Sequence, residues 1–172
     1  MKKEVRLYNM IFPIWLLWLF PMTWIVVLPA NFLLDSAVVL ITMKCLKLTE
    51  IKQKTRSIIF KTWLLGFAAD FIGTFFMFSA NLIEDRLSTE TAFGKWWYYN
   101  INAVTYSPFD NIYSISWAAI CVVITAIFIY RFNYKLCFKK LEIEDALKKK
   151  LALSLAIFTA PYVFFLPTSW FY

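Results

Sequence analysis

Two aspartates stand inside strongly apolar runs, and they are the residues of this chain best suited to chemistry. Asp35 lies in NFLLDSAVVLITMKCL and Asp70 lies in GFAADFIG. An ionisable residue inside a membrane span is costly and usually marks a functional site. A buried carboxyl can stay protonated, share a proton with a second carboxyl, or hold a cation. We expect an ion or substrate site at Asp70 and Asp35, with Thr74 and Asn31 as further oxygen donors.

The spacing of the two acids suggests that they could meet. Asp35 lies eleven residues from the end of its run at Leu46, and Asp70 lies twelve residues from the start of its run at Ile58. At the rise of an α-helix, these separations place both carboxyls at similar depth in consecutive antiparallel helices. No Lys or Arg lies at that depth, so we expect Asp70 to be protonated or cation-bound at neutral pH.

Structural roles remain open for both acids. Asp35 is only four residues after Asn31 and could dock an outer loop near the start of its helix. Asp70 could donate or accept a hydrogen bond with a Ser or Thr of a neighbouring helix, or it could pair with a basic residue of another subunit.

The composition is that of a membrane protein. Of the 172 residues, 61% are hydrophobic and 20% are aromatic, whereas a soluble domain is nearer half apolar. There is no His, and the three Cys have no paired spacing. We therefore expect no metal site, no catalytic residues and no cofactor. G-x-S-x-G, HExxH and P-loop motifs are also absent, so the sequence favours a protein that is not an enzyme.

Five apolar runs must position these residues. They predict an all-α, polytopic membrane helix bundle that forms one transmembrane domain over residues 1–172. A span needs about 20 residues, and two of the runs are shorter. Pro21 is expected to kink the first helix, and Pro29 and Asn31 to form a turn in which Asn31 caps the second helix. The predicted transmembrane helices are 11–28, 31–46, 58–83, 113–138 and 151–166.

The basic residues predict the orientation of the bundle. Sixteen of the 18 Lys and Arg lie before the first run or around the second and fourth connections, and the other two, Arg86 and Lys95, follow the third run. With five spans, the three clusters fall on one side. Basic loops stay in the cytoplasm, so the N-terminus is predicted inside and the C-terminus outside.

Small residues mark the helix faces that should pack together. Beside Asp70, the small residues fall three and four positions apart, and large residues such as Phe75 fall on the opposite side. In lipid, small residues favour helix contacts. The predicted packing residues are Gly66, Ala69 and Gly73 in the third run and Ala152, Ala156 and Ala160 in the fifth.

The connection 84–112 is unusually aromatic, with Trp96, Trp97, Tyr98 and Tyr99 in a row. Trp and Tyr favour the membrane interface, so this outer loop either lies among the headgroups or forms a platform for a ligand. The sequence alone leaves both readings open.

These patterns favour a small transporter or a module that translocates ions or protons. A non-catalytic accessory or assembly subunit of a larger membrane complex is the alternative, and an intramembrane lipid-modifying enzyme ranks lower. The expected partners are the lipid bilayer, a second copy or another membrane subunit, and a small ion or solute. Nucleic acid is not expected, because the basic residues lie in short clusters between apolar runs. The expected location is the plasma membrane of a bacterium, as a multi-pass protein.

Overall fold

The computed structural model describes residues 21–170, and within this range it contains helices and no strand. The predicted all-α class is therefore confirmed for the described chain. Three helical segments are long and apolar enough to cross a membrane, namely α1, α2 and α4 with its continuation to Lys140. The α-helices are α1 (Pro21–Cys45), α2 (Ile51–Glu84), α3 (Ala92–Asn100), α4 (Ile112–Phe132) and α5 (Asp145–Phe158).

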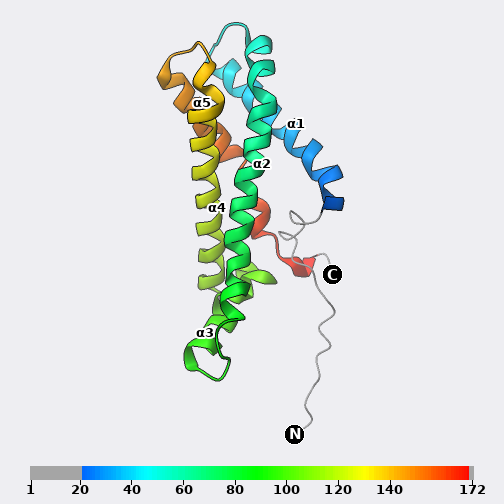
Figure 1. Cartoon of the computed structure of the whole chain (residues 1–172), viewed down its shortest axis with the longest axis vertical. Helices are drawn as coiled ribbons and strands as arrows, with labels where there is room; N and C mark the ends of the chain where they lie inside the picture. The colour runs from blue at the N-terminus through cyan, green and yellow to red at the C-terminus, as the bar shows by residue number, and fades with distance from the viewer. Residues whose placement is uncertain (1–20, 171–172) are drawn as a thin grey trace.

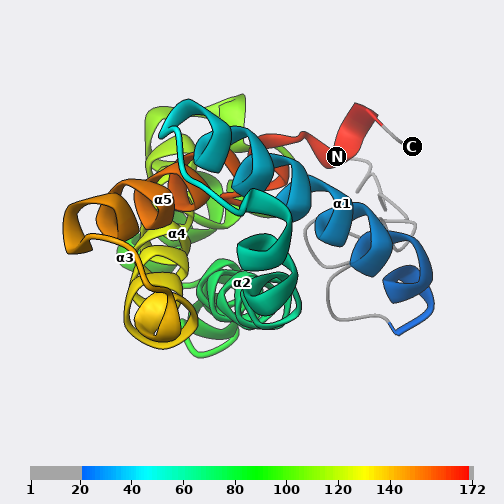
Figure 2. The same ribbon diagram turned by 90° about the horizontal axis from the view of Figure 1, so that it is seen from above.

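The long helices α2 and α4 lie side by side over most of their length (Figure 1) and make the most extensive helix contact of the described chain. α1 packs on α2 but leans away from it toward its own N-terminal end, as both views show (Figures 1 and 2). α5 packs on α4 and also touches α1. Because α1 packs on α2, α5 packs on α4, and α1 touches α5, residues of α1 and of the chain after α5 come together beside α2.

The predicted hairpin between helices 11–28 and 31–46 is wrong, because α1 continues through Pro29 and Asn31 to Cys45. Proline inside a helix leaves one carbonyl without its donor, and membrane helices tolerate this when neighbouring helices supply other hydrogen bonds. For Pro29 that carbonyl is Ile25 O. α2 contacts the same segment, since Trp63 Nε1 donates to Leu28 O at 2.9 Å. Residues 11–20 of the first predicted helix lie outside the described residues, and Pro21 is the first residue of α1.

The third and fourth apolar runs form helices, with changed ends. α2 begins at Ile51, seven residues before the predicted start, and ends at Glu84. After Phe132, α4 continues as a π-helical turn, Asn133–Cys137, and a 3₁₀ turn, Phe138–Lys140. Lys61 of α2 supports this irregular turn, because its Nζ donates to Leu136 O at 2.9 Å.

The fifth predicted helix, 151–166, is displaced toward the basic connection before it. α5 begins at Asp145 and ends at Phe158, and a separate 3₁₀ turn, Tyr162–Phe165, follows. Pro161 explains the early end: it has no N–H for the carbonyl four residues before it, which is Ile157 O. The Tyr162 hydroxyl takes that role and donates to Ile157 O at 2.6 Å.

The chain after this break reaches the far end of the bundle. Thr168 N donates to Tyr106 O at 2.8 Å, and Thr168 Oγ1 donates to Thr105 O at 3.2 Å. The segment from Asp145 to Thr168 thus begins beside the π-helical turn after α4 and ends beside the connection after α3. Among residues 21–170, three helices are of spanning length, and the segment that contains the fifth predicted span is interrupted.

The aromatic connection 84–112 is more regular than a loop. It contains α3 and two 3₁₀ turns, Asn102–Thr105 and Pro108–Asp110. Thr91 caps α3, since its side chain accepts a hydrogen bond from Gly94 N. Asn111 caps α4 in the same way, and its side chain accepts from Tyr113 N and Ser114 N.

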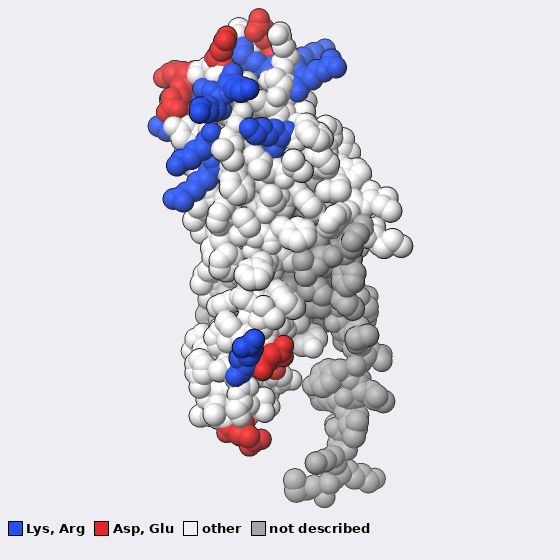
Figure 3. Space-filling model, viewed as in Figure 1, with Lys and Arg blue, Asp and Glu red and all other residues white. Residues whose placement is uncertain are grey.

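Most of the described Lys and Arg gather at one end of the molecule, which we call the basic end (Figure 3), whereas Arg86 follows α2 and Lys95 lies on α3. This end contains the connection between α1 and α2 and the connection between α4 and α5. In the second connection, Asp145 accepts hydrogen bonds from Tyr134 Oη at 2.9 Å and pairs with Lys149 Nζ at 2.8 Å. The bonds from Lys149 and Tyr134 lower the pKa of Asp145 below its ordinary value.

Candidate functional site

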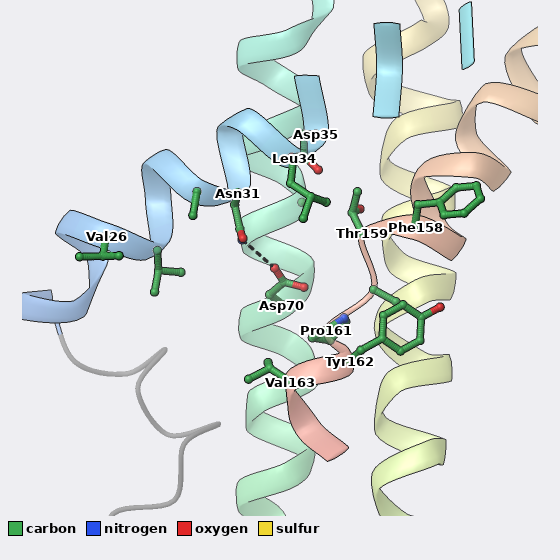
Figure 4. Close-up of a pocket in the computed structure, with 14 residues that line it drawn as sticks. Val26, Asn31, Leu34, Asp35, Asp70, Phe158, Thr159, Pro161, Tyr162 and Val163 are labelled. Carbon is green, nitrogen blue, oxygen red and sulfur yellow. Dashed lines mark hydrogen bonds between the residues drawn. The ribbon is translucent and has the colours of Figure 1, made fainter. Parts of the chain in front are cut away.

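A cavity of about 410 Å³ lies between α1, α2 and the chain that follows α5 (Figure 4). Both aspartates line it, and so does the break at Pro161. We call it the Asp35–Asp70 cavity. α1 contributes Val26, Val27, Ala30, Asn31, Leu34 and Asp35, α2 contributes Gly66 and Asp70, and the α5 end contributes Phe158, Thr159, Ala160, Pro161, Tyr162 and Val163.

Asp70 is buried, and its carboxyl group is only half satisfied. Asn31 Nδ2 donates to Asp70 Oδ2 at 3.4 Å, a distance at the long end of the range for hydrogen bonds. Asp70 Oδ1 is buried and has no hydrogen-bond partner among residues 21–170. A buried acceptor without a partner costs about 1–3 kcal/mol. The site would therefore gain from a proton, a water or a cation at Oδ1.

Asp35 is buried on the opposite helix, and Gly66 provides the space in front of it. A Cβ atom at position 66 would lie 3.4 Å from Asp35 Oδ2, at ordinary van der Waals distance. Any longer side chain at this position would project toward the carboxyl group. The small residue predicted to serve packing therefore also keeps this side of the cavity open.

The end of α5 completes the cavity opposite Asp35. Thr159 lies beside Asp35 (Figure 4), and its hydroxyl donates to Leu155 O at 2.9 Å. Because a hydroxyl has one proton and two lone pairs, Thr159 Oγ1 can then accept a hydrogen bond from a protonated Asp35. The C-terminus of a helix also carries a partial negative charge. α5 thus adds to the negative potential of the two acids.

The other predicted oxygen donor, Thr74, does not line the cavity. Its side chain is fully buried, and its hydroxyl donates to the backbone oxygen of Asp70 at 2.9 Å. This bond to the preceding turn is common for Thr in a helix. Thr74 therefore supports the helix under Asp70 instead of contributing a ligand, whereas Asn31 lines the cavity and contacts Asp70 directly.

The small residues of α2 that were predicted to pack against other helices lie in two different environments. Gly66 faces the cavity, whereas Ala69 and Gly73 are buried in the bundle. Gly73 lies against Thr125 of α4 and Phe164. Phe75, on the opposite side of α2, is 61% exposed, as expected for a lipid-facing residue.

The predicted stripe of the fifth run is interrupted. Ala152 and Ala156 are buried on α5, but Ala160 follows the end of this helix and packs in a different cluster, with Met77 and Phe164. The break before Pro161 separates positions that a continuous helix would align.

The four consecutive aromatic residues lie on α3, away from the Asp35–Asp70 cavity. Trp97 is half-buried, and its Nε1 donates to Ala80 O of α2 at 3.0 Å. Trp96 contacts the ring of Tyr113 edge-on, and Tyr98 contacts that of Tyr99. The hydrogen bond of Trp97 therefore holds α3 against α2. None of the four lines the Asp35–Asp70 cavity, and their role at a membrane interface or for a ligand stays a prediction.

In comparisons with protein-family models, with curated proteins and with solved structures, no significant match to this chain was found. The function must therefore be argued from the cavity itself.

Sequence reasoning missed the wall formed by Phe158, Thr159 and Tyr162. One signal was present, because the apolar run 151–166 is short and contains Pro161. In membrane transporters, short or proline-interrupted hydrophobic segments often mark a binding site.

Replacing Tyr162 with Phe should destabilise the wall of the cavity. The substitution removes the hydroxyl that donates to Ile157 O, and Pro161 has no N–H to replace it. We expect the free energy of unfolding to fall by about 1–3 kcal/mol, measured by thermal unfolding of the purified protein in detergent. Tyr99→Phe is the control, since no hydrogen bond of its hydroxyl is found among residues 21–170. Equal melting temperatures for the two variants would contradict this account of the break.

Proposed function

We propose that this protein is a membrane transporter or ion-translocating module in which Asp70, with Asp35 as its partner, binds a proton or another monovalent cation. The main observation behind the proposal is that Asp70 Oδ1 is buried and has no hydrogen-bond partner among the described residues. Asp70 also lines a cavity together with a second acid, Asp35. Two adjacent carboxylates resist ionising together, and a proton or cation relieves that repulsion.

The interrupted helix supports the same function. Inside a bilayer, non-helical backbone is tolerated where it is buried in protein or lines a cavity. Here the break between Phe158 and Tyr162 lines the Asp35–Asp70 cavity. In transporters, the C-terminal ends of broken helices carry a partial negative charge and help to form cation sites. The negative end of α5 and the two acids favour a cation over an anion.

The basic end supports a cytoplasmic orientation. The connections that carry most of the described Lys and Arg lie together at this end (Figure 3), and basic loops stay in the cytoplasm. In our proposal the basic end is inside, α3 is outside, and the segment from Asp145 to Thr168 crosses toward the outer side with a break at the cavity. The interrupted segment thus contains the last of the five predicted spans, 151–166.

Cysteine labelling tests this orientation. In a background in which Cys45, Cys121 and Cys137 are replaced with Ala, we expect a membrane-impermeant maleimide to label Lys95→Cys in intact cells. Lys54→Cys and Lys148→Cys should react only after permeabilisation, because both lie at the basic end. Labelling of Lys148→Cys in intact cells would reject the proposed orientation.

Reconstitution tests the function. The purified full chain in liposomes should dissipate an imposed gradient of protons or of a monovalent cation faster than liposomes without protein. A pH-sensitive dye inside the liposomes measures the proton flux, and a potassium or sodium indicator measures the alternatives. Flux equal to that of protein-free liposomes for all three ions would count against a translocating module.

A further inference from the structure

The Asp35–Asp70 cavity is much larger than a proton or a bare ion requires. Its volume is about 410 Å³, whereas one water molecule occupies about 30 Å³ in the liquid. Cavities of about 300–1,000 Å³ are typical of sites for small organic molecules. The described residues also contain no group of three or more His, Cys, Asp or Glu that could hold a metal ion. The size therefore points to an organic ligand.

The carboxyl and amide side chains of the cavity lie on one side. Asp35 and Asn31 of α1 and Asp70 of α2 form that side, and Asn31 and Asp70 are linked by their hydrogen bond (Figure 4). No Lys or Arg lines the cavity, and Asp70 Oδ1 is buried without a partner among residues 21–170. A ligand that donates N–H groups and carries a positive charge would satisfy this oxygen.

Apart from Thr159 and Tyr162, whose hydroxyls donate to backbone oxygens of α5, the remaining walls are apolar, and they open sideways. Val26 and Leu34 of α1 are 72% and 47% exposed, and Phe158 at the end of α5 is 65% exposed, although all three line the cavity. α1 is one of the helices long and apolar enough to cross a membrane. The mouth of the cavity therefore faces the acyl-chain layer instead of an aqueous end of the bundle.

We propose that the cavity binds an amphipathic organic cation, a protonated amine with an apolar body, that enters from the lipid side. The ammonium group contacts the carboxyl groups of Asp70 and Asp35, and the apolar body lies against Val26, Leu34 and Phe158. This inference rests on the proposed function, because it names the class of cation that the same site takes. A molecule of this kind partitions into the bilayer interface and so reaches a lateral opening.

Equilibrium dialysis with radiolabelled n-hexylammonium tests the inference on the purified full chain in detergent. We expect saturable binding to the wild type and a dissociation constant at least about tenfold higher for Asp70→Asn, because a buried charge pair loses one partner. Comparing the two proteins at equal detergent concentration cancels uptake by micelles. Asp35→Asn should also weaken binding, and it keeps the test decisive if Asp70→Asn does not fold. Neutral n-hexanol, which has the same alkyl chain, should not distinguish wild type from variants.

Two results would overturn the inference. The first is hexylammonium binding that is equal in the wild type and in both variants, which would show partition without a site. The second is displacement of hexylammonium by an equal concentration of sodium, which would show a site for small ions. The proposed function has its own test, the liposome flux of protons and monovalent cations. Failure of this inference can therefore be distinguished from failure of the proposed function.

Discussion

Asp70→Asn should reduce the proton or cation flux of reconstituted protein to the level of protein-free liposomes, while the variant still folds. Asn has nearly the size of Asp and can still accept a hydrogen bond from Asn31 Nδ2, which lies 3.4 Å from Asp70 Oδ2. An amide cannot release a proton near neutral pH or provide a negative charge. The substitution thus removes the exchanging group and retains the packing.

Asp35→Asn provides the comparison for this experiment. Asp35 lines the same cavity but lies on α1, so its loss should alter the pH dependence of the flux without abolishing it. Infrared difference spectroscopy of the carboxyl bands gives a second readout, in wild type and in both variants. If Asp70→Asn transports as the wild type does, Asp70 is a structural hydrogen-bonding acid and the proposal is wrong.

Gly73→Ala should destabilise the bundle far more than Gly66→Ala, although both change a glycine of α2 by one methyl group. A Cβ atom at position 73 would overlap Thr125 Oγ1 of α4 and would lie 3.1 Å from Phe164 Cε2. Both neighbours are fully buried and cannot move aside easily. Overpacking of this kind costs about 1–3 kcal/mol, and Gly73→Leu should cost more.

Gly66→Ala is the matched control, because its Cβ atom would meet Asp35 Oδ2 only at 3.4 Å. Phe75→Leu should also be mild, since Phe75 is 61% exposed. The measurement is thermal unfolding in detergent, followed by size-exclusion chromatography. Thr125→Gly combined with Gly73→Ala should recover part of the lost stability, because contacting residues show coupled effects. Equal stability of the two alanine variants would show that α2 and α4 do not approach at Gly73.

Several features follow from the sequence alone because they depend on composition and local spacing. The apolar runs predict a helical membrane protein, and the described chain is helical and contains three helices long enough to cross a membrane, although the sequence predicted five spans. The three- and four-residue spacing along α2 separates a buried face that contains Asp70 and Gly73 from an exposed face that contains Phe75. The positions of Lys and Arg indicate which connections share an end of the bundle.

Only the tertiary structure decided what each proline does. Pro29 lies within a continuous helix, whereas Pro161 follows the end of one. Local sequence does not distinguish them, because the outcome depends on contacts with distant residues, such as those of Trp63 of α2 with the Phe32 ring and Leu28 O of α1. The cavity depends on what happens at both prolines. The uninterrupted α1 carries Asn31 and Asp35 past Asp70, and the early end of α5 places Thr159 opposite them. Spacing along the chain predicts the depth of a side chain in a helix, but the lean of α1 and the break after α5 determine which side chains share a cavity.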